Sequence, residues 1–374
     1  MSEGRSARAG LAGGAGEPPL PHHLDQHPAV MHPLREPEDV SAFRRAVHHL
    51  AAALRAPEAA LHRAELVATE LASNTLRHAR PPGYLLLSAL RGEGRGLEML
   101  AVDGGPGIAD LAAALAPRSA VPALDGSTGL GCGLGAVKRQ ATESDLHSLP
   151  GKGTVVLARF LFEPPAHPPD LRCAGVSVPV VYEVQSGDAW SYRRDGEGCT
   201  VLLVDGLGHG AAAAEASAAA LAAFAQGPID DLPGILEEAH RAMRNTRGAA
   251  AFLCRVEPGR RRLLHAGVGN VEGRIHRRGA RGGKRSSVGL VSRNGTLGIS
   301  LAMPEVRVQE TEWQEGDLLV LYSDGVRGHF DLDAYPGLCR HDPAVVAAVL
   351  HRDLTRGRDD ATVVALKDQR EPRC

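Results

Sequence analysis

The chain has 374 residues, of which 43% are hydrophobic, and its formal net charge is −2 with histidine neutral. This length can supply two domains, each with its own core. The near-neutral charge provides no basic field for nucleic acid, so we expect small-molecule or protein ligands. The longest apolar run, residues 211–225, contains Glu215 and is shorter than the roughly 20 residues that cross a bilayer, which predicts a helix without membrane contact.

The N-terminal segment and the cysteines suggest a compartment. Residues 1–35 are rich in Gly, Ala, Pro and His but lack the apolar core of a signal peptide, so we expect a disordered segment. The six cysteines are scattered without a C-x-x-C pair, which fits neither a zinc site nor a disulfide framework. Both observations favour a cytoplasmic protein.

Hydrophobic periodicity in residues 36–162 predicts a first domain of mixed secondary structure. Helices are expected over about 39–55, 58–79 and 134–142. Strands are expected at 84–90, 97–102 and 154–162. The first two strands flank a glycine-rich turn and predict a hairpin.

A proline-rich stretch, EPPAHPPD, suits a stiff connector, so we place a linker at residues 163–173 and a second domain at 174–367. Short apolar segments rich in β-branched residues predict strands near 176–184, 200–205, 250–256, 262–268, 271–276, 317–323 and 361–366. Helices are expected near 210–225, 229–244 and 343–354. Many strands with few helices favour an α+β sandwich over alternating βαβ units.

The segment ELVATELASNTLRHA places Glu70, Asn74 and His78 at intervals of four, on one face of a predicted helix. A carboxylate one turn before an amide oxygen could pair a proton acceptor with a magnesium ligand. The ordinary alternative is a solvated polar face.

Three glycine-rich segments follow that helix in order. VDGGPGI, residues 102–108, ends a strand with an aspartate and supplies glycines where the backbone turns tightly. GSTGLGCGLGAVKR, residues 126–139, opens a helix whose first N–H groups can hold phosphate. GKGTVV, residues 151–156, brings a threonine hydroxyl into a strand. Together with the polar helix they indicate a nucleotide site.

This ordered set resembles the GHKL ATP-binding fold over about residues 38–162, and most closely the serine kinases of bacterial partner-switching systems, including the RsbT type, whose G-x-V-K-R run is similar to GAVKR here. The resemblance implies a Bergerat α/β sandwich that binds ATP with Mg²⁺. It implies that Asn74 binds the magnesium, Glu70 is the catalytic base and Asp103 holds the adenine amino group. The remaining cofactor-binding residues implied are Gly105, Gly107, Gly129, Gly131, Gly133, Gly135 and Thr154.

Aspartates next to predicted strand ends recur in the second half, at Asp188, Asp205, Asp324 and the pair Asp359 and Asp360. Clustered carboxylates repel one another unless they bind cations, and their hard oxygens suit Mg²⁺ or Mn²⁺. A single Asp-Gly is more often a turn. Two such pairs directly after apolar strands, with D-D-A-T entering another, predict a metal site.

The D-G-x-G-H-G, S-D-G and D-D-A-T runs, in this order, resemble the metal-dependent type 2C serine/threonine phosphatases in their SpoIIE and RsbX branch, over about residues 174–367. The resemblance implies an αββα sandwich with two ions. Asp205 would bridge them together with the carbonyl of Gly206, Asp324 and Asp359 would hold the second ion, and Asp188 would reach metal through water. Adjacent Asp360 stays open as an alternative to Asp359.

These resemblances imply a bacterial partner-switching regulator that hydrolyses phosphoserine or phosphothreonine on a STAS-type antagonist protein, with a serine kinase activity in its ATP-binding domain. A homodimer is compatible with the resemblance. The alternative is a switch that binds ATP without transferring phosphate, captures a partner and gates the phosphatase. A dinucleotide-dependent metabolic enzyme is disfavoured, because the loop at 206–210 lacks both an acidic residue about 20 positions on and a βαβ context.

Overall fold

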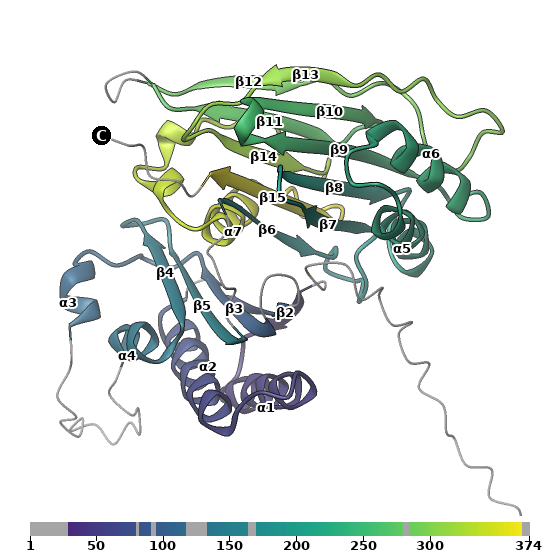
Figure 1. Cartoon of the computed structure of the whole chain (residues 1–374). Helices are drawn as coiled ribbons and strands as arrows, with labels where there is room; N and C mark the ends of the chain where they lie inside the picture. The colour runs from purple at the N-terminus through teal and green to yellow at the C-terminus, as the bar shows by residue number, and fades with distance from the viewer. Residues whose placement is uncertain are drawn as a thin grey trace, which may run out of the picture.

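The computed structural model describes residues 29–79, 82–90, 95–116, 133–163, 170–279 and 284–368. Its architecture is α+β, with an N-terminal helix-and-sheet domain lying against a C-terminal sandwich of two sheets (Figure 1). None of the helices in the described ranges combines the length and the apolar character that a membrane crossing needs.

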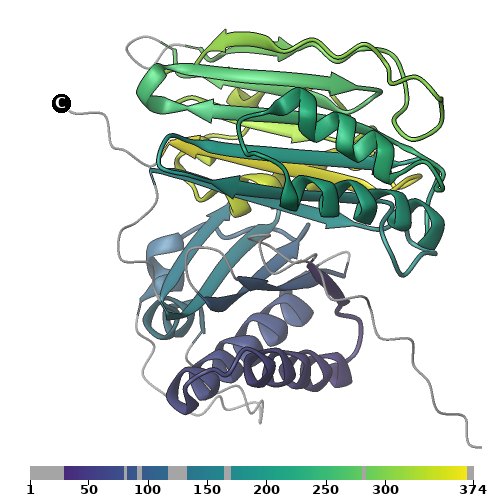
Figure 2. The same ribbon diagram turned by 45° about the vertical axis from the view of Figure 1, so that its right-hand side comes forward.

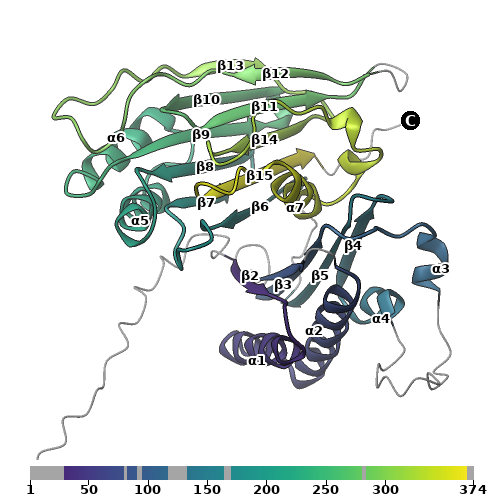
Figure 3. The ribbon, with the colours of Figure 1, turned by 180° about the vertical axis from the view of Figure 1, so that it is seen from behind.

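The N-terminal domain is built on an antiparallel five-stranded sheet with the order β1-β2-β3-β5-β4. Its strands are β1 (Val30–Pro33), β2 (Tyr84–Leu90), β3 (Arg95–Asp103), β4 (Glu143–Ser148) and β5 (Thr154–Glu163). Its helices are α1 (Pro37–Ala53), α2 (Glu58–His78), α3 (Leu111–Leu115) and α4 (Gly133–Gln140). The longest two helices and α4 lie together below the sheet, over one of its faces (Figure 3).

Helix α2 shows how the sequence pattern builds this layer. Small and apolar residues buried three or four positions apart, Ala60, Ala64, Val67, Leu71 and Thr75, form the stripe that faces the sheet. The helix ends at His78, shortly before a pair of prolines that cannot continue it. The predicted ends, 58 and 79, therefore agree with the structure to within one residue.

The C-terminal domain stacks two five-stranded sheets, with orders β13-β10-β9-β8-β7 and β12-β11-β14-β15-β6. The first sheet contains β7 (Asp188–Arg194), β8 (Cys199–Gly206), β9 (Ala249–Glu257), β10 (Arg262–Val268) and β13 (Gln309–Glu312). The second contains β6 (Leu171–Val178), β11 (Glu272–Arg277), β12 (Ser286–Leu290), β14 (Leu318–Tyr322) and β15 (Ala361–Asp368). Helices α5 (Ala211–Gln226) and α6 (Leu232–Ala242) cover the first sheet, and α7 (Pro343–Leu354) covers the second (Figure 2).

Strand β8 contributes to two cores because its side chains alternate between the two faces of the sheet. Val201 and Leu203 pack between the two sheets, whereas Leu202 and Val204 pack under α5 and α6. Both faces are therefore apolar, and the strand appears in the sequence as an uninterrupted hydrophobic run.

Several sequence expectations need correction. Residues 30–33 were expected to be disordered but form β1, which pairs with β2. The predicted strand at 176–184 is displaced: β6 begins at Leu171, within the expected linker, and ends at Val178, because Pro179 cannot donate to a sheet. Residues 188–194 were not predicted as a strand but form β7.

Helix α7 belongs to both domains. It packs on β6 and β15 of its own domain and on β3 and β5 of the N-terminal sheet. One hydrophobic core accordingly contains Leu100 and Leu157 from the N-terminal sheet together with Val345 and Leu350 from α7. The face of the N-terminal sheet opposite α1 and α2 is covered by the C-terminal domain (Figure 1).

Candidate metal and nucleotide sites

The predicted aspartates of the C-terminal domain gather where strand ends from the two sheets meet. Asp188 opens β7 and lies directly opposite Asp205, the penultimate residue of β8. Asp324 follows β14, while Asp359 and Asp360 immediately precede β15. Each of the other four aspartates acts electrostatically on Asp205. The structure therefore places the five predicted aspartates near one another.

Asp205 is repelled by all four of the other carboxylates in this group. Burial and then the neighbouring carboxylates, Asp188 first, raise the pKa of Asp205 to about 9. Its Oδ2 atom is buried without a hydrogen-bond partner. Burial likewise raises the pKa of Asp188 to about 7. Carboxylates in this state favour a cation, because a cation removes both the burial cost and the mutual repulsion.

The two adjacent aspartates before β15 have different surroundings. Asp360 is buried and accepts hydrogen bonds from the backbone N–H groups of Val180 (2.7 Å) and Gly187 (2.5 Å), so it holds the loop between β6 and β7. Asp359 is more exposed and raises the pKa of Asp324. The Asp360 carboxylate is thus already bonded to backbone N–H groups, whereas Asp359 remains near Asp324.

Two supporting side chains had no role in the sequence interpretation. Ser323 donates from its hydroxyl to Asp188 Oδ2 at 2.6 Å, and Asn270 donates from Nδ2 to Asp324 Oδ2 at 2.5 Å. Ser323 stands inside the S-D-G run and could have been found from it. Asn270 comes from a distant loop, which only the fold brings to Asp324.

A cavity of about 330 Å³ opens beside Asp324. Its lining includes Asn270, Ser292, Tyr322 and Arg356. The guanidinium of Arg356 lowers the pKa of Asp324, opposing the larger effect of burial. The Asp324 carboxylate and the Arg356 guanidinium therefore lie near one another beside this cavity.

The donor set fits a hard divalent cation, since it consists of carboxylate oxygens and one of them, Asp205 Oδ2, is buried and unpartnered. Across the described residues, no three His, Cys, Asp or Glu side chains already converge in a ready-made coordination geometry. Asp324 is engaged with Asn270 instead. Binding of a cation would therefore require reorientation of this exposed carboxylate.

Gly206 permits the close approach of β8 to the following helix. A Cβ at this position would lie 2.3 Å from the carbonyl oxygen of Ala213 in α5. The N–H of Gly206 donates to the carbonyl of Gly187 at 3.1 Å, which ties β8 to the loop that Asp360 holds. A larger residue would push α5 away from Asp205.

In the N-terminal domain, α2 presents Glu70 and Asn74 one turn apart. Glu70 is only 7% exposed, and burial raises its pKa although the N–H of Gly133, at the start of α4, hydrogen-bonds to it. Asn74 is partly buried, and His78 is exposed at the end of the helix. The structure thus places Glu70 against the first turn of the helix that the glycine-rich segment opens.

Asp103 ends β3 and accepts a hydrogen bond from the N–H of Gly105 at 2.8 Å. Burial raises its pKa, opposed by hydrogen bonds from the Gly105 and Thr154 backbones. A Cβ on Gly105 would lie 2.7 Å from the carbonyl oxygen of His78, so the loop after β3 packs tightly on the end of α2. The structure therefore brings Asp103 and the α2 residues to the same end of the domain.

The other predicted glycines that the structure describes, and the predicted threonine, lie in segments near Asp103 and α2. Gly107 has a φ of +70°, and a Cβ there would lie 2.1 Å from the Leu149 carbonyl oxygen. Thr154 Oγ1 lies 2.9 Å from Ser148 Oγ, which also accepts from the N–H of Ile108 at 2.8 Å. Two of the predicted phosphate-loop glycines, Gly133 and Gly135, begin α4, whereas Gly129 and Gly131 lie outside the described residues.

One contact at this corner has no signal in the sequence. Arg352, near the end of α7, donates from Nη1 to the carbonyl oxygen of Asp103 at 3.1 Å. The two residues are 249 positions apart in the chain. Only the packing of α7 on the N-terminal sheet brings them together.

Two regions of the chain match the models of known protein families. Residues 195–368 match the family model of Stage II sporulation protein E (SpoIIE). Residues 34–160 match the histidine kinase-like ATPase domain.

Individual relatives were also compared. The phosphoserine phosphatase RsbX of Bacillus subtilis (strain 168) is 32% identical over 90 residues, which are 24% of this chain and 45% of RsbX. The chain thus spans less than half the length of this curated relative. A structure from work on the bacterial stressosome is 28% identical, covers 53% of this chain and all of its own, and has a TM-score of 0.47. A structure of RsbX with magnesium is 20% identical, covers 54% of this chain and 98% of its own, and has a TM-score of 0.45.

Proposed function

Because the chain joins a histidine kinase-like ATPase domain at residues 34–160 to a SpoIIE-type, type 2C phosphatase domain at residues 195–368, we propose that it is a metal-dependent serine/threonine protein phosphatase. The observation that carries the proposal is Asp205, a buried and unpartnered carboxylate surrounded by four others at converging strand ends. Such a cluster favours binding of a cation, and a cavity opens beside one of its members, Asp324.

In this proposal Asp205 and the Gly206 carbonyl would hold Mn²⁺ or Mg²⁺ together with Asp324 and Asp359, and Asp188 would support the bound ions. When bound, the ions supply a hydroxide at neutral pH and stabilise the charge on the phosphoryl group. Ser323 orients Asp188 by its hydrogen bond, and Asn270 does the same for Asp324.

The proposed substrate is a phosphoserine or phosphothreonine on a STAS-type antagonist protein. The match to RsbX, described as a phosphoserine phosphatase, supports the residue class. The STAS identity follows from the partner-switching character of the families that both halves resemble.

The decisive assay measures phosphate release from a phosphoserine STAS-domain protein in the presence of MnCl₂. We expect Asp205→Asn and Asp324→Asn to lose at least about 100-fold in rate, comparable to losing one preorganised charge-stabilising group. Asp230→Asn is the matched control, because Asp230 is an exposed aspartate between α5 and α6. Full activity in either cluster variant would contradict the metal assignment.

We further propose that the N-terminal domain binds ATP through Asp103 and Asn74 and transfers phosphate to a serine with Glu70 as base. The raised pKa of the buried Glu70 carboxyl supports this role, because an effective base titrates closer to neutral pH than an exposed glutamate does. The contact from Arg352 to Asp103 favours the second candidate, a switch in which bound nucleotide gates the phosphatase without transfer.

Labelled ATP and an unphosphorylated STAS protein distinguish these two functions. The assay is best run in the Asp205→Asn background, so that any phosphoserine formed is not hydrolysed. Transfer that Glu70→Gln abolishes would establish the kinase. ATP-dependent partner binding without transfer would establish the switch.

A further inference from the structure

Helix α7 is the structural element shared by the two proposed sites. Ten of its residues are buried, from Pro343 to Leu354, because it is enclosed between the N-terminal sheet and the sheet that contains β6 and β15. A helix with partners on both sides cannot shift relative to one without affecting the other. Its two ends have different surroundings.

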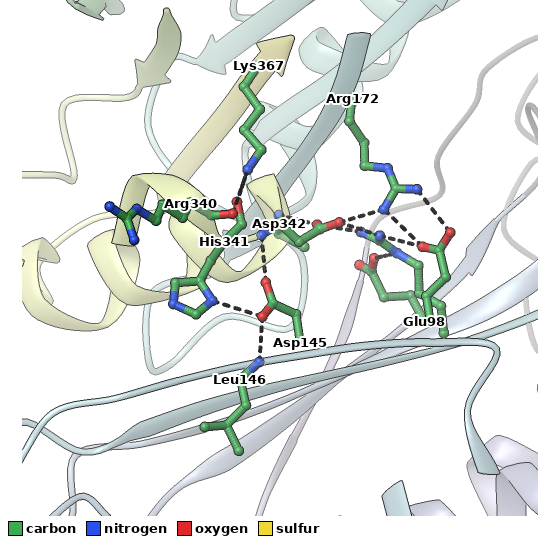
Figure 4. A network of polar contacts seen from close by, with 11 residues as sticks. Glu98, Asp145, Leu146, Arg172, Arg340, His341, Asp342 and Lys367 are labelled. Carbon is green, nitrogen blue, oxygen red and sulfur yellow. Dashed lines mark hydrogen bonds and ion pairs between the residues drawn. The ribbon is translucent and has the colours of Figure 1, made fainter. Parts of the chain in front are cut away.

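A buried network of charged side chains holds the N-terminal end of α7 (Figure 4). Asp342, the N-cap, accepts two hydrogen bonds from Arg159 of β5, at 2.7 and 2.8 Å, and one from Arg172 of β6 at 2.9 Å. Arg159 also donates to the buried Glu98 of β3 at 2.6 Å. The backbone N–H of Asp342 donates to Asp145 of β4 at 2.6 Å. This end is therefore fixed to the N-terminal sheet by bonds to two of its strands, β4 and β5, and to its own domain by Arg172 of β6.

The C-terminal end of α7 contacts the proposed nucleotide site. Arg352 donates to the Asp103 carbonyl oxygen, and its Nε is held by Asp353 at 2.7 Å. In the preceding residue, His351, Nδ1 lies 3.2 Å from the hydroxyl of Tyr84. The residue proposed to hold adenine is thus in direct backbone contact with the phosphatase domain.

The same end continues into the proposed metal site. The N–H of Arg327 donates to the carbonyl of Leu354 at 2.9 Å, and the N–H of Arg356 donates to the carbonyl of Gly325 at 2.8 Å. Gly325 directly follows Asp324, and Val326 forms a β-bridge with Thr355. Four residues after Thr355 the chain reaches Asp359.

We propose that nucleotide bound at Asp103 controls the phosphatase site through the C-terminal end of α7, with Arg352 as the coupling residue. This inference rests on the proposed function of both sites. The physical basis is that the Asp103 side chain would contact nucleotide while its carbonyl holds Arg352. Ordering the end of β3 therefore changes the restraint on α7 and on the turn that positions Asp324. Coupling of this kind must be reciprocal, so occupancy of one site alters the affinity of the other.

The test uses the full chain with saturating MnCl₂, p-nitrophenyl phosphate as substrate, and the non-hydrolysable ATP analogue AMP-PNP. We expect bound AMP-PNP to change kcat/KM by about fivefold or more, the lower end of typical allosteric coupling. Arg352→Gln should still bind AMP-PNP and hydrolyse the substrate at the unliganded rate, but without the fivefold change. A wild-type rate that is unaffected by bound AMP-PNP would overturn the proposal.

A matched control removes a charge from the opposite end of the same helix. Arg172→Gln leaves Asp342 paired with Arg159 and lies away from the Asp103 contact, so it should keep the response to AMP-PNP. Loss of the response in both variants would indicate general loosening of the interface and would overturn the specific role of Arg352.

Amide hydrogen exchange separates failure of the coupling from failure of the phosphatase assignment. AMP-PNP should change exchange in residues 352–358 of the wild type and not of Arg352→Gln, whether or not the protein hydrolyses phosphate. An inactive protein with this exchange response would refute the phosphatase function and retain the coupling. Unchanged exchange with bound analogue would refute the coupling.

Discussion

At the scale of single residues, the clearest sign of function is the unfavourable free energy of burying the Asp205 carboxylate among other carboxylates. A buried carboxylate with an unpartnered oxygen and four acidic neighbours destabilises the fold in the absence of a cation. Proteins keep such groups where function needs them. The motif runs point to the aspartates of the cluster as candidate ligands, whereas the different surroundings of Asp359 and Asp360 depend on which backbone N–H groups lie nearby.

This cost leads to a stability prediction that does not depend on activity. Asp205→Asn should raise the free energy of unfolding of the metal-free protein at pH 8 by about 0.5–2 kcal/mol, because Asp205, whose pKa is raised to about 9, must take up a proton on folding and asparagine need not. Thermal or urea denaturation in EDTA measures the change. Asp230→Asn should leave stability unchanged, and a destabilised Asp205→Asn protein would mean that its carboxylate is not repelled in the native state.

At the scale of elements, the loop between β4 and β5 shapes the proposed nucleotide pocket. Gly151 and Gly153 both have positive φ, +75° and +79°. A Cβ on Gly153 would lie 2.0 Å from the carbonyl oxygen of Asp103, whereas a Cβ on Gly151 would have no atom within 4 Å. The G-K-G run therefore contains one glycine required for backbone conformation and one required also for close approach.

Alanine substitutions should separate these two requirements. Gly151→Ala should cost about 1–2 kcal/mol of stability from the left-handed backbone alone and keep ATP binding. Gly153→Ala should cost more and weaken ATP binding strongly, because β5 must move away from Asp103. Isothermal titration with ATP and urea denaturation test both variants. Equal ATP affinity in the two variants would place Asp103 outside the nucleotide site.

At the scale of the whole molecule, the two domains share a core and a buried charge network through α7. Arg159 is 6% exposed and pairs with two buried carboxylates, Glu98 and Asp342. Arg172 is more exposed and shares Asp342 with it. The domains are consequently expected to unfold together, since neither sheet is covered on both faces without α7.

Breaking this network should destabilise the protein as one unit. Arg159→Met should cost about 3–5 kcal/mol, because it leaves buried carboxylates with too little compensation. Arg172→Gln should cost roughly 1 kcal/mol or less, as for other partly exposed ion pairs. Calorimetry should show a single transition in the wild type. Two separate transitions with an unchanged first midpoint in Arg159→Met would contradict the shared interface.

The interface also predicts a dependence on pH. Burial lowers the pKa of His351, which faces Tyr84 across the interface, to about 4 from an ordinary 6.5. The folded state therefore excludes a proton that the unfolded state binds, so stability is full above pH 6.5 and falls as the pH decreases towards 4.

Denaturation midpoints between pH 7 and 4 measure this effect. His351→Gln should remove up to about 3 kcal/mol of the acid-induced loss, at 1.36 kcal/mol for each pH unit between the two pKa values. Other buried histidines such as His265, whose pKa is also lowered to about 4, act in the same direction, whereas Asp188 and Asp205, whose pKa values are raised, act in the opposite direction. An identical pH profile in His351→Gln would show that this histidine titrates normally in the folded protein.

The sequence by itself determined the α+β class and the approximate extents of most helices and of the central strands, and its motifs supplied two sets of candidate site residues. Those features depend on local periodicity and on short motifs whose members are close in the chain. It did not predict β1, β4, β7, β12 or β13, which all lie at sheet edges and are each fixed by pairing with one neighbouring strand.

Only the tertiary structure decided how the two sites are related. Arg352 and Asp103 are 249 residues apart, and no local pattern distinguishes this arginine from other charged residues at the end of a helix. The same holds for Asn270 beside Asp324. Contacts of this kind arise when separate sheets enclose one helix or meet at their strand ends, so their physical cause is packing between distant segments and not the preference of any one segment.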